Sequence, residues 1–326
     1  PGDTLKIHLI NKLPPEQHPP NCDPLGNCNH NSPHNFNTTN LHFHGLHVDP
    51  TGSSDNVFIK LQPEDEFHYE VKIPKDHVAG TFWYHAHVHG ASSVQVGSGM
   101  AGALIIKGDY DELPKLRKAK QRILMLQQIA YDENGRIENN NTYAPVIWDQ
   151  EAESRGWHIS INGQVMPEIE LKPGEMQLWR LIHAGVRKNL NLKLVSACNN
   201  NKTKRLVQLA ADGIPFRKKR VSDDASVFLA PGYRNDVAVK INRRGVYYLV
   251  DASNDTDADL PDSYCDEIRG SEPLMLDESA QNILARVVVK GQRLKMRYPS
   301  NNSMQTLNRP KSIAEQELSD LSLIHI

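Results

Sequence analysis

Hydrophobic and polar residues alternate with a period of two along several short stretches of the chain. The alternation covers residues 5–9, 67–73 and 237–241. Successive side chains of a strand point to opposite faces, so this pattern predicts strands with one buried face. A continuous apolar run at residues 123–126 predicts a buried strand.

Turn residues separate these stretches. Asp-Glu-Asn-Gly at 132–135 and Asp-Gly at 212–213 are typical of tight turns between strands. Many short strands joined by such turns predict an all-β protein built of sandwiches or barrels. The 326 residues are enough for about two domains of roughly 150 residues each.

The second half of the chain resembles a degenerate copy of the first half. Three pairs of segments can be aligned: 1–3 with 173–175, 80–87 with 245–252, and 103–108 with 286–291. Pro-Gly in the first pair suits a type II turn that opens a strand. His85 and His87 of the first half correspond to Val250 and Ala252 of the second. We therefore expect tandem domains, of which the second kept its strands and lost its histidines.

Two His-x-His pairs, His42 with His44 and His85 with His87, are the strongest chemical signal. In a strand, each pair projects from one face. A lone histidine in a strand is most simply structural, but two such pairs favour a metal site. Imidazole binds copper, zinc, iron and nickel, so the spacing alone does not name the metal.

The other histidines and nearby large side chains are expected to be structural. His8 and His68 fall on the polar faces of predicted strands, and His30 and His34 fall in a Pro- and Asn-rich loop that we expect to be exposed. The remaining predicted structural histidines are His77, His89, His158 and His183. We expect Met100 to pack in the core, and Trp83 and Tyr84 to shield the histidines from water.

Three runs carry a resemblance to a known family: Leu-His-Phe-His-Gly-Leu at 41–46, Gly-Thr-Phe-Trp-Tyr-His-Ala-His at 80–87, and Gly-Met-Ala-Gly-Ala-Leu-Ile-Ile at 99–106. They resemble the first domain of laccase-like multicopper oxidases. The resemblance implies tandem Greek-key cupredoxin domains at residues 1–116 and 117–291. The first would carry the copper ligands, and the second would carry none.

The resemblance also implies roles for individual residues. His42 would bind a type 2 copper, while His44, His85 and His87 would bind a type 3 copper pair. These are four of the family's eight trinuclear-site histidines. Asp55 would help deliver protons to reduced oxygen, since a carboxylate linked through water is a suitable relay. The alternative for Asp55 is an Asx-turn.

Family members oxidise a phenol, an aromatic amine or a metal ion at a type 1 copper and reduce dioxygen to water. Their C-terminal domain supplies a His-x-x-His-x-His run and a His-Cys-His run, and neither occurs in these 326 residues. The four cysteines, Cys22, Cys28, Cys198 and Cys265, have no adjacent histidine, so the type 1 site is expected to be absent. We therefore expect half a trinuclear site, no turnover by this chain alone, and a missing C-terminal cupredoxin domain as partner.

Charge and hydropathy exclude some classes of partner. The 37 basic and 39 acidic residues nearly balance, which argues against nucleic acid or an anionic membrane as the main partner. No run of 18 apolar residues occurs, so we expect no membrane span. The even cysteine count, together with the resemblance, favours a periplasmic or secreted protein. Cys22–Cys28 and Cys198–Cys265 disulfides are one of three possible pairings.

Both ends of the sequence are expected to be unnatural. The chain opens at Pro1 without an initiator methionine. Residues 292–320 are predicted to be a linker toward a third domain, with a capping box opening a short helix at 312–320. Residues 321–326 match the translation of a sequencing-library adapter, so we exclude His325 from all chemistry.

Other function classes remain open at this point. A copper-binding or scaffold protein with a cupredoxin fold but no electron transfer would carry the same histidines. A zinc hydrolase could use three of them to activate water, but no clear glutamate base lies beside them. Copper nitrite reductase needs a type 1 His-Cys ligand set that this sequence lacks.

Overall fold

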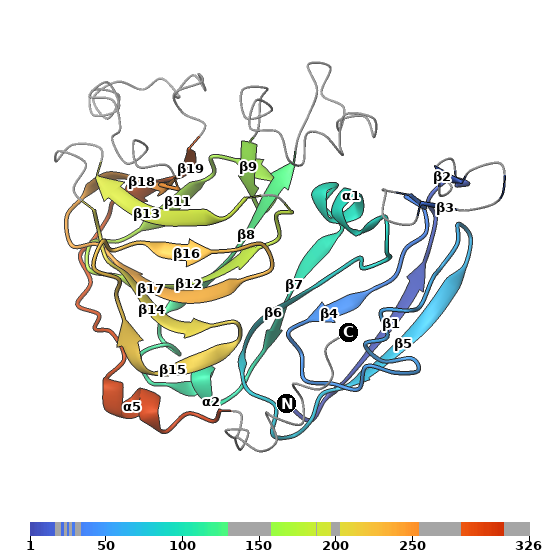
Figure 1. The fold of residues 1–326 in the computed structure, drawn as a ribbon. Coiled ribbons are helices and arrows are strands. Elements are labelled where there is room, and N and C mark those ends of the chain that lie inside the picture. The colour runs from blue at the N-terminus through green and yellow to red at the C-terminus, as the bar shows by residue number, and fades with distance from the viewer. Residues whose placement is uncertain are drawn as a thin grey trace.

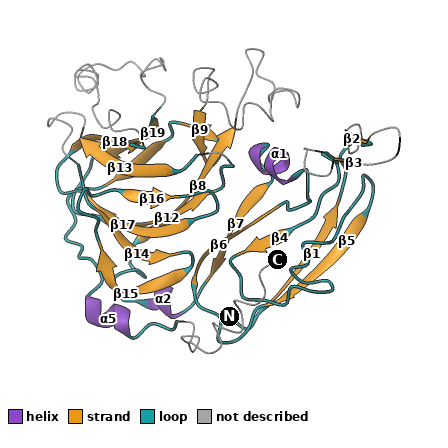
Figure 2. Cartoon of the chain, viewed as in Figure 1, coloured by secondary structure: helices purple, strands orange, loops and turns teal. Residues whose placement is uncertain are grey.

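β-strands dominate the part of the chain that the computed structural model describes (Figure 2). The described residues are 1–16, 21–22, 25, 28–29, 34–129, 158–186, 188–196, 203–253 and 282–309. The all-β prediction is confirmed. The helix predicted at 312–320, the segment 321–326 and both proposed disulfides lie outside the residues or side chains described.

In the first part of the chain, the two-stranded sheet of β1 and β5 and the three-stranded sheet of β4, β6 and β7 pack around one core, and β2 pairs with β3. Phe43, Tyr69, Val71 and Phe82 are buried in the core between them. The strands are β1 (Thr4–Ile10), β2 (Asn21–Cys22), β3 (Cys28–Asn29), β4 (His42–His44), β5 (Glu66–Lys72), β6 (Gly80–His85) and β7 (Ala101–Ile106).

The second part of the chain forms a sandwich of two larger sheets. One has the strand order β10-β9-β8-β12-β17-β14-β15 and the other β11-β19-β18-β13-β16. Side chains of both sheets, among them Trp179 and Leu249, share one buried core. The strands are β8 (Lys120–Ile129), β9 (His158–Ile161), β10 (Gln164–Val165), β11 (Glu168–Leu171), β12 (Met176–His183), β13 (Leu190–Ser196), β14 (Leu206–Ala211), β15 (Ile214–Arg220), β16 (Val227–Leu229), β17 (Arg234–Lys240), β18 (Gly245–Asp251) and β19 (Ile283–Val289).

Short helices connect or flank the sheets: α1 (Ser92–Gly97), α2 (Asp109–Glu112) and α5 (Asn301–Gln305). α5 falls within the predicted linker 292–320. Ser300 caps its N-terminus, because the Ser300 hydroxyl accepts a hydrogen bond from the Ser303 N–H. Met304 of α5 is buried in a cluster with Met176 and Leu178 of β12. α5 is therefore packed against the second part of the chain.

The predicted strands form where the alternation placed them. β1 alternates exposed and half-buried residues along its whole length, because only one of its faces meets the core. The apolar run 123–126 lies in β8. Leu124, Met125 and Leu126 are buried there, whereas Ile123 is exposed, so the prediction of full burial is wrong for that residue.

The strand pairing matches the internal repeat that the sequence suggested. Gly80 of β6 faces Ile106 of β7, and the corresponding Gly245 of β18 faces Val289 of β19. The opening turns also correspond, because Gly2 and Gly174 both have positive φ angles, 89° and 72°. Their N–H groups donate to the equivalent carbonyls of Ile73 and Ile241.

The domain boundary predicted after residue 116 remains a prediction. In the described part of the chain, every sheet takes its strands either from residues 4–106 or from residues 120–289. β6 and β7 lie between β4 and the strands of the second part (Figure 1). β6 and β7 are therefore in contact with the sandwich of the second part.

A buried charge network joins the two parts of the chain. Arg180 of β12 donates to Asp236 of β17 at 3.0 Å and also to Asp111 of α2. Thr81 of β6 donates to Asp236 and accepts from Arg180. The Arg180 and Asp236 side chains are 1% exposed. Burial raises the pKa of Asp236, and the Arg180 charge opposes that rise.

We predict that Arg180→Ala lowers the free energy of unfolding by about 3–5 kcal/mol, because it leaves the buried Asp236 carboxylate without its cation, while Asp111 keeps its ion pair with Lys107. Urea denaturation measures the loss. The matched control is Arg286→Ala, which removes an ion pair with Glu168 in which both side chains are more than a third exposed. That change should cost about 0–1 kcal/mol. Equal losses in the two variants would contradict this account of the network.

Candidate metal centre

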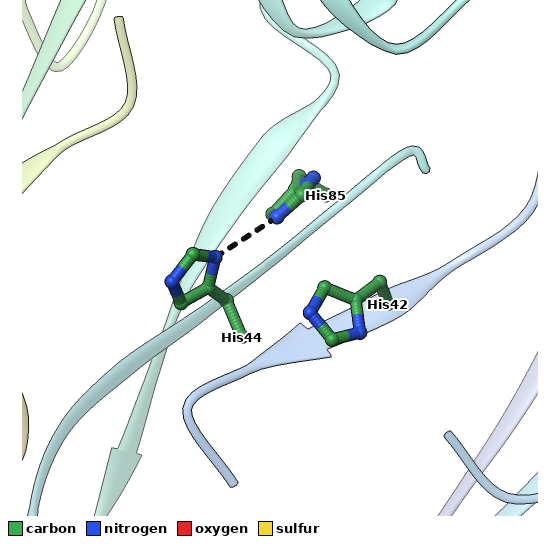
Figure 3. A group of neighbouring side chains, drawn as sticks. All are labelled: His42, His44 and His85. Atoms are coloured by element: carbon green, nitrogen blue, oxygen red, sulfur yellow. Dashed lines mark hydrogen bonds between the residues drawn. The ribbon is translucent and has the colours of Figure 1, made fainter. Parts of the chain in front are cut away.

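The candidate centre is created by the pairing of β4 with β6. In this antiparallel pair, His42 lies directly opposite His85, and His44 lies opposite Trp83. One ring nitrogen from each of His42, His44 and His85 can be chosen so that all three lie within 4.8 Å of one another. Figure 3 shows the three imidazoles converging from the two strands.

Two of these rings are in direct contact. His44 Nδ1 lies 3.2 Å from His85 Nε2. The His42 ring centroid lies 5.2 Å from that of His85 and 5.0 Å from that of His87. His42 and His44 of β4, together with His85, which lies 41 residues after His44, therefore surround one small volume.

Hydrogen bonds determine which nitrogen of each ring carries the proton. His85 Nδ1 lies 2.9 Å from the carbonyl oxygen of Ala86, which can only accept, so the proton is on Nδ1. His42 Nδ1 lies 2.9 Å from Asp55 Oδ1, and that oxygen also accepts the Phe43 N–H at 2.8 Å. In both rings Nε2 then carries a lone pair and no proton, which is the form that binds a metal, and the His85 Nε2 accepts a hydrogen bond from His44 Nδ1.

Burial keeps the central histidines neutral. It lowers the pKa of His44 to about 3, helped by the Arg234 charge and the neighbouring imidazoles. Burial also lowers the pKa of His85 to about 4, against the opposing hydrogen bond to the Ala86 carbonyl. A metal ligand must be a neutral imidazole, so both residues are in the binding form at neutral pH.

Comparisons with known proteins agree on one family. Residues 29–111 match the family model described as multicopper oxidase. A multicopper oxidase of Staphylococcus aureus is 26% identical over 243 residues, and Laccase-1 of Thanatephorus cucumeris is 25% identical over 262 residues. A solved multicopper oxidase of Pseudomonas thermotolerans superposes with a TM-score of 0.63 at 22% identity, over 99% of this chain.

Each of these matches is to a multicopper oxidase or a laccase. The all-β architecture is that of the family's cupredoxin-like sandwich domains, as predicted. The chain covers 45% and 40% of the lengths of the two curated relatives, while 74% and 77% of its own length is matched. It covers 61% of the solved neighbour. Among the described residues, no helix has the length and apolar character needed to cross a bilayer.

Residues of the second part of the chain complete the surroundings of the site. Arg234 of β17 donates to the carbonyl oxygen of Thr81 and to that of Gly232. Gly45, directly after His44, has φ 85°, and a Cβ there would lie 2.2 Å from an Arg234 nitrogen. Glycine is therefore required at Gly45 both by its conformation and by this close approach.

Sequence reasoning missed both Arg234 and Asn40 as parts of the site. Asn40 accepts the His87 N–H at 2.7 Å and donates to the carbonyl oxygens of Val57 and Ile59. Asn40 lies two residues before His42, and this position could have marked it as part of the site. Its side chain ties the His42 segment to the His87 segment. No local pattern marks Arg234, which lies 190 residues away from His44 in the sequence.

Aromatic packing encloses one side of the site. The Trp83 ring stacks on His85 at 4.2 Å and on His44 at 5.0 Å, and Trp83 is 3% exposed. Its predicted shielding role is confirmed. The prediction is wrong for Tyr84, which is 37% exposed, because adjacent residues of β6 point to opposite faces.

The strand prediction is wrong for His87. β6 ends at His85, and His87 follows it outside any strand, with its N–H bound by the Asn40 side chain. The His87 ring still lies near that of His42, but His87 is exposed and stands outside the group of three convergent nitrogens.

Several other predicted environments differ in the structure. His34, expected in an exposed loop, is 3% exposed, and His77, expected to be structural, is 5% exposed. His77 Nε2 accepts the His47 N–H, and its Nδ1 donates to the Val78 carbonyl, so its role is to hold two loop segments together. Met100, expected in the core, is 36% exposed. His183 is fully buried and structural, as predicted.

We predict that the metal-free chain loses stability as the pH falls from 6.5 toward 4. His44 and His85 have folded-state pKa values below the unfolded value of 6.5. The unfolded chain therefore binds more protons in this window, and stability is fully present only above it. The contribution of these two groups to the slope is at most about 2.7 kcal/mol per pH unit. Urea denaturation of chelator-treated protein at several pH values measures the slope.

The double variant His44→Gln/His85→Gln should flatten this dependence. His47→Gln is the control, because His47 is exposed and lies outside the group of convergent ring nitrogens. An unchanged slope in the double variant would show that other groups cause the loss.

Proposed function

We propose that this chain carries half of the dioxygen-reducing copper site of a laccase-like multicopper oxidase. The observation that carries the proposal is the convergence of His42, His44 and His85 with ring nitrogens within 4.8 Å of one another. The family resemblance supplies the metal, because copper is the cofactor that multicopper oxidases share.

The donor set fits copper. Imidazole is a ligand that copper accepts in both of its common oxidation states, and hydrogen bonds orient the rings of His42 and His85. Bound copper would supply one-electron transfers to dioxygen. In this proposal His42 holds a type 2 copper, and His44, His85 and His87 hold the type 3 pair.

Asp55 is proposed to have two linked roles. Its carboxylate, with a side chain 10% exposed, accepts the Nδ1 proton of His42 and so keeps the His42 Nε2 lone pair directed away from it. A carboxylate at this position, next to one ligand and partly exposed, could also hold a proton for the reduction of dioxygen that bound copper would carry out. The Asx-turn alternative receives no support, because Asp55 Oδ1 bonds to residues of β4.

We propose that the remaining ligands come from protein outside these 326 residues. The sequence contains neither a His-x-x-His-x-His run nor a His-Cys-His run, and the chain spans less than half of its curated relatives. A further cupredoxin domain would supply both runs and the type 1 copper that takes electrons from a phenol, an amine or a metal ion. The proposed location is the periplasm or the extracellular space.

We predict that the chain binds copper and that His85→Gln weakens the binding by at least about 10-fold. His85 is chosen because it faces His44 and pairs with His42. Competition of Cu²⁺ binding against a chelator of known affinity measures the change. His47→Gln, which alters an exposed histidine elsewhere, should bind copper as the unaltered chain does. Equal copper affinities for the unaltered chain, His85→Gln and His47→Gln would contradict the assignment of His85 as a copper ligand.

We predict about a 10–100-fold loss of copper affinity in Asp55→Asn, because the amide no longer favours a protonated His42 Nδ1. Asp49→Asn is the matched control, since Asp49 lies on the same loop and bonds to Thr51 instead of a histidine. The same competition assay applies. An effect of the Asp49 change as large as that of the Asp55 change would mean that the loop, and not the His42 contact, matters.

For oxidase activity, we predict no steady oxygen consumption by the copper-loaded chain alone with a phenolic reductant. The gene extended through a His-Cys-His run should restore turnover, and Asp55→Asn in that protein should lower kcat by about 100-fold or more. An oxygen electrode measures both. Turnover by the chain alone would contradict the half-site proposal, and copper binding without turnover in the extended protein would favour a scaffold or copper-binding role.

A further inference from the structure

A second cluster of metal-binding side chains lies on the outer face of β1 and β5. His8 of β1 lies directly opposite His68 of β5, and the two rings stack with centroids 4.1 Å apart and planes 18° apart. His8 Nε2 lies 3.0 Å from Glu66 Oε2. Ring nitrogens of both histidines and a carboxylate oxygen of Glu66 lie within 4.8 Å of one another.

The strand pairing brings these residues together. Glu66 and His68 are two residues apart in β5, so they share a face, and the antiparallel register places His8 against them. All three are exposed, whereas the opposite face of the same strands packs on the core through residues such as Tyr69. An ion could reach the cluster from solvent without any movement of the backbone.

The two nearby lysines pair with Glu70, while Glu66 contacts His8. Lys6 and Lys72 both lie beside Glu70, at 3.9 Å and 3.8 Å, one step further along the same face. The ion pairing of the two lysines with Glu70 draws their cationic groups toward that residue. The two imidazoles and the Glu66 carboxylate therefore form a site beside the lysine ammonium groups, which pair with Glu70 instead.

We propose that His8, Glu66 and His68 form a surface site for one zinc or copper(II) ion, on a different sheet from the His42 cluster. Two histidines with one carboxylate are a ligand set that suits both ions and leaves positions open for water. In a tetrahedral site the ligand nitrogens are roughly 3.3 Å apart, as follows from metal–nitrogen bonds of about 2.0–2.1 Å. The ligand atoms of the three residues now lie within 4.8 Å of one another, so metal binding requires the side chains to rotate toward this spacing.

Such an ion would link the N-terminal strand to the rest of the chain. β1 pairs only with β5 among the described strands, so cross-strand coordination ties down one member of a two-stranded sheet. Ligand binding to the folded state alone adds to its stability by mass action. The site would therefore couple the stability of β1 to the concentration of free metal ion.

Zinc is the probe for the test, because it is diamagnetic and has no redox chemistry. Chain labelled with ¹⁵N in its histidines is titrated with Zn²⁺ and followed through the imidazole nitrogen resonances, with His8 and His68 assigned from their Gln variants. We expect the resonances of His8 and His68 to shift together, with one dissociation constant. This readout separates the site from the His42 cluster, whose resonances report independently.

His68→Gln should weaken zinc binding at His8 by at least about 10-fold, and Glu66→Gln should weaken it without removing either ring. His47→Gln is the matched control for removal of an exposed histidine. Backbone amide spectra show whether the β1–β5 pairing persists in each variant. His8 resonances that do not move at saturating zinc, or that move equally in the unaltered chain and in His68→Gln, would overturn the proposal.

Discussion

The antiparallel pairing of β4 with β6 is the constraint on which the candidate metal centre depends. Its register places His42 opposite His85, and the side-chain period of two brings His44 to the same side. Hydrogen bonds from Nδ1 of His42 and His85 then leave Nε2 of both rings without a proton, and burial keeps His44 and His85 uncharged. A shift of one residue in this pairing would turn one strand's histidines to the opposite face.

The second part of the chain supports this pairing although it carries no candidate ligand itself. Its strands repeat the pairing of the first part, and its buried Arg180 and Asp236 reach across to Thr81 of β6. Arg234 fills the space beside Gly45, where no side chain would fit. The second part of the chain thus holds in place the strand that carries His85.

Much of the fold and the core of the site could be predicted from the sequence, because both depend on local patterns. Alternation identified β1 and β17, and the His-x-His spacing identified His42 and His44. Contacts between distant segments could not be predicted, such as Arg234 against Gly45 and the burial of His77. No local pattern records which loop will cover a residue, and strand ends such as that of β6 depend on tertiary hydrogen bonds.

The most direct test of the central claim is the position of copper in crystals of this chain soaked with Cu²⁺, located by anomalous diffraction at the copper absorption edge. The account predicts a copper peak among the imidazoles of His42, His44 and His85, with the Asp55 contact to His42 preserved. Ordered copper elsewhere in the crystal, with none among these three rings, would contradict the assignment of the site.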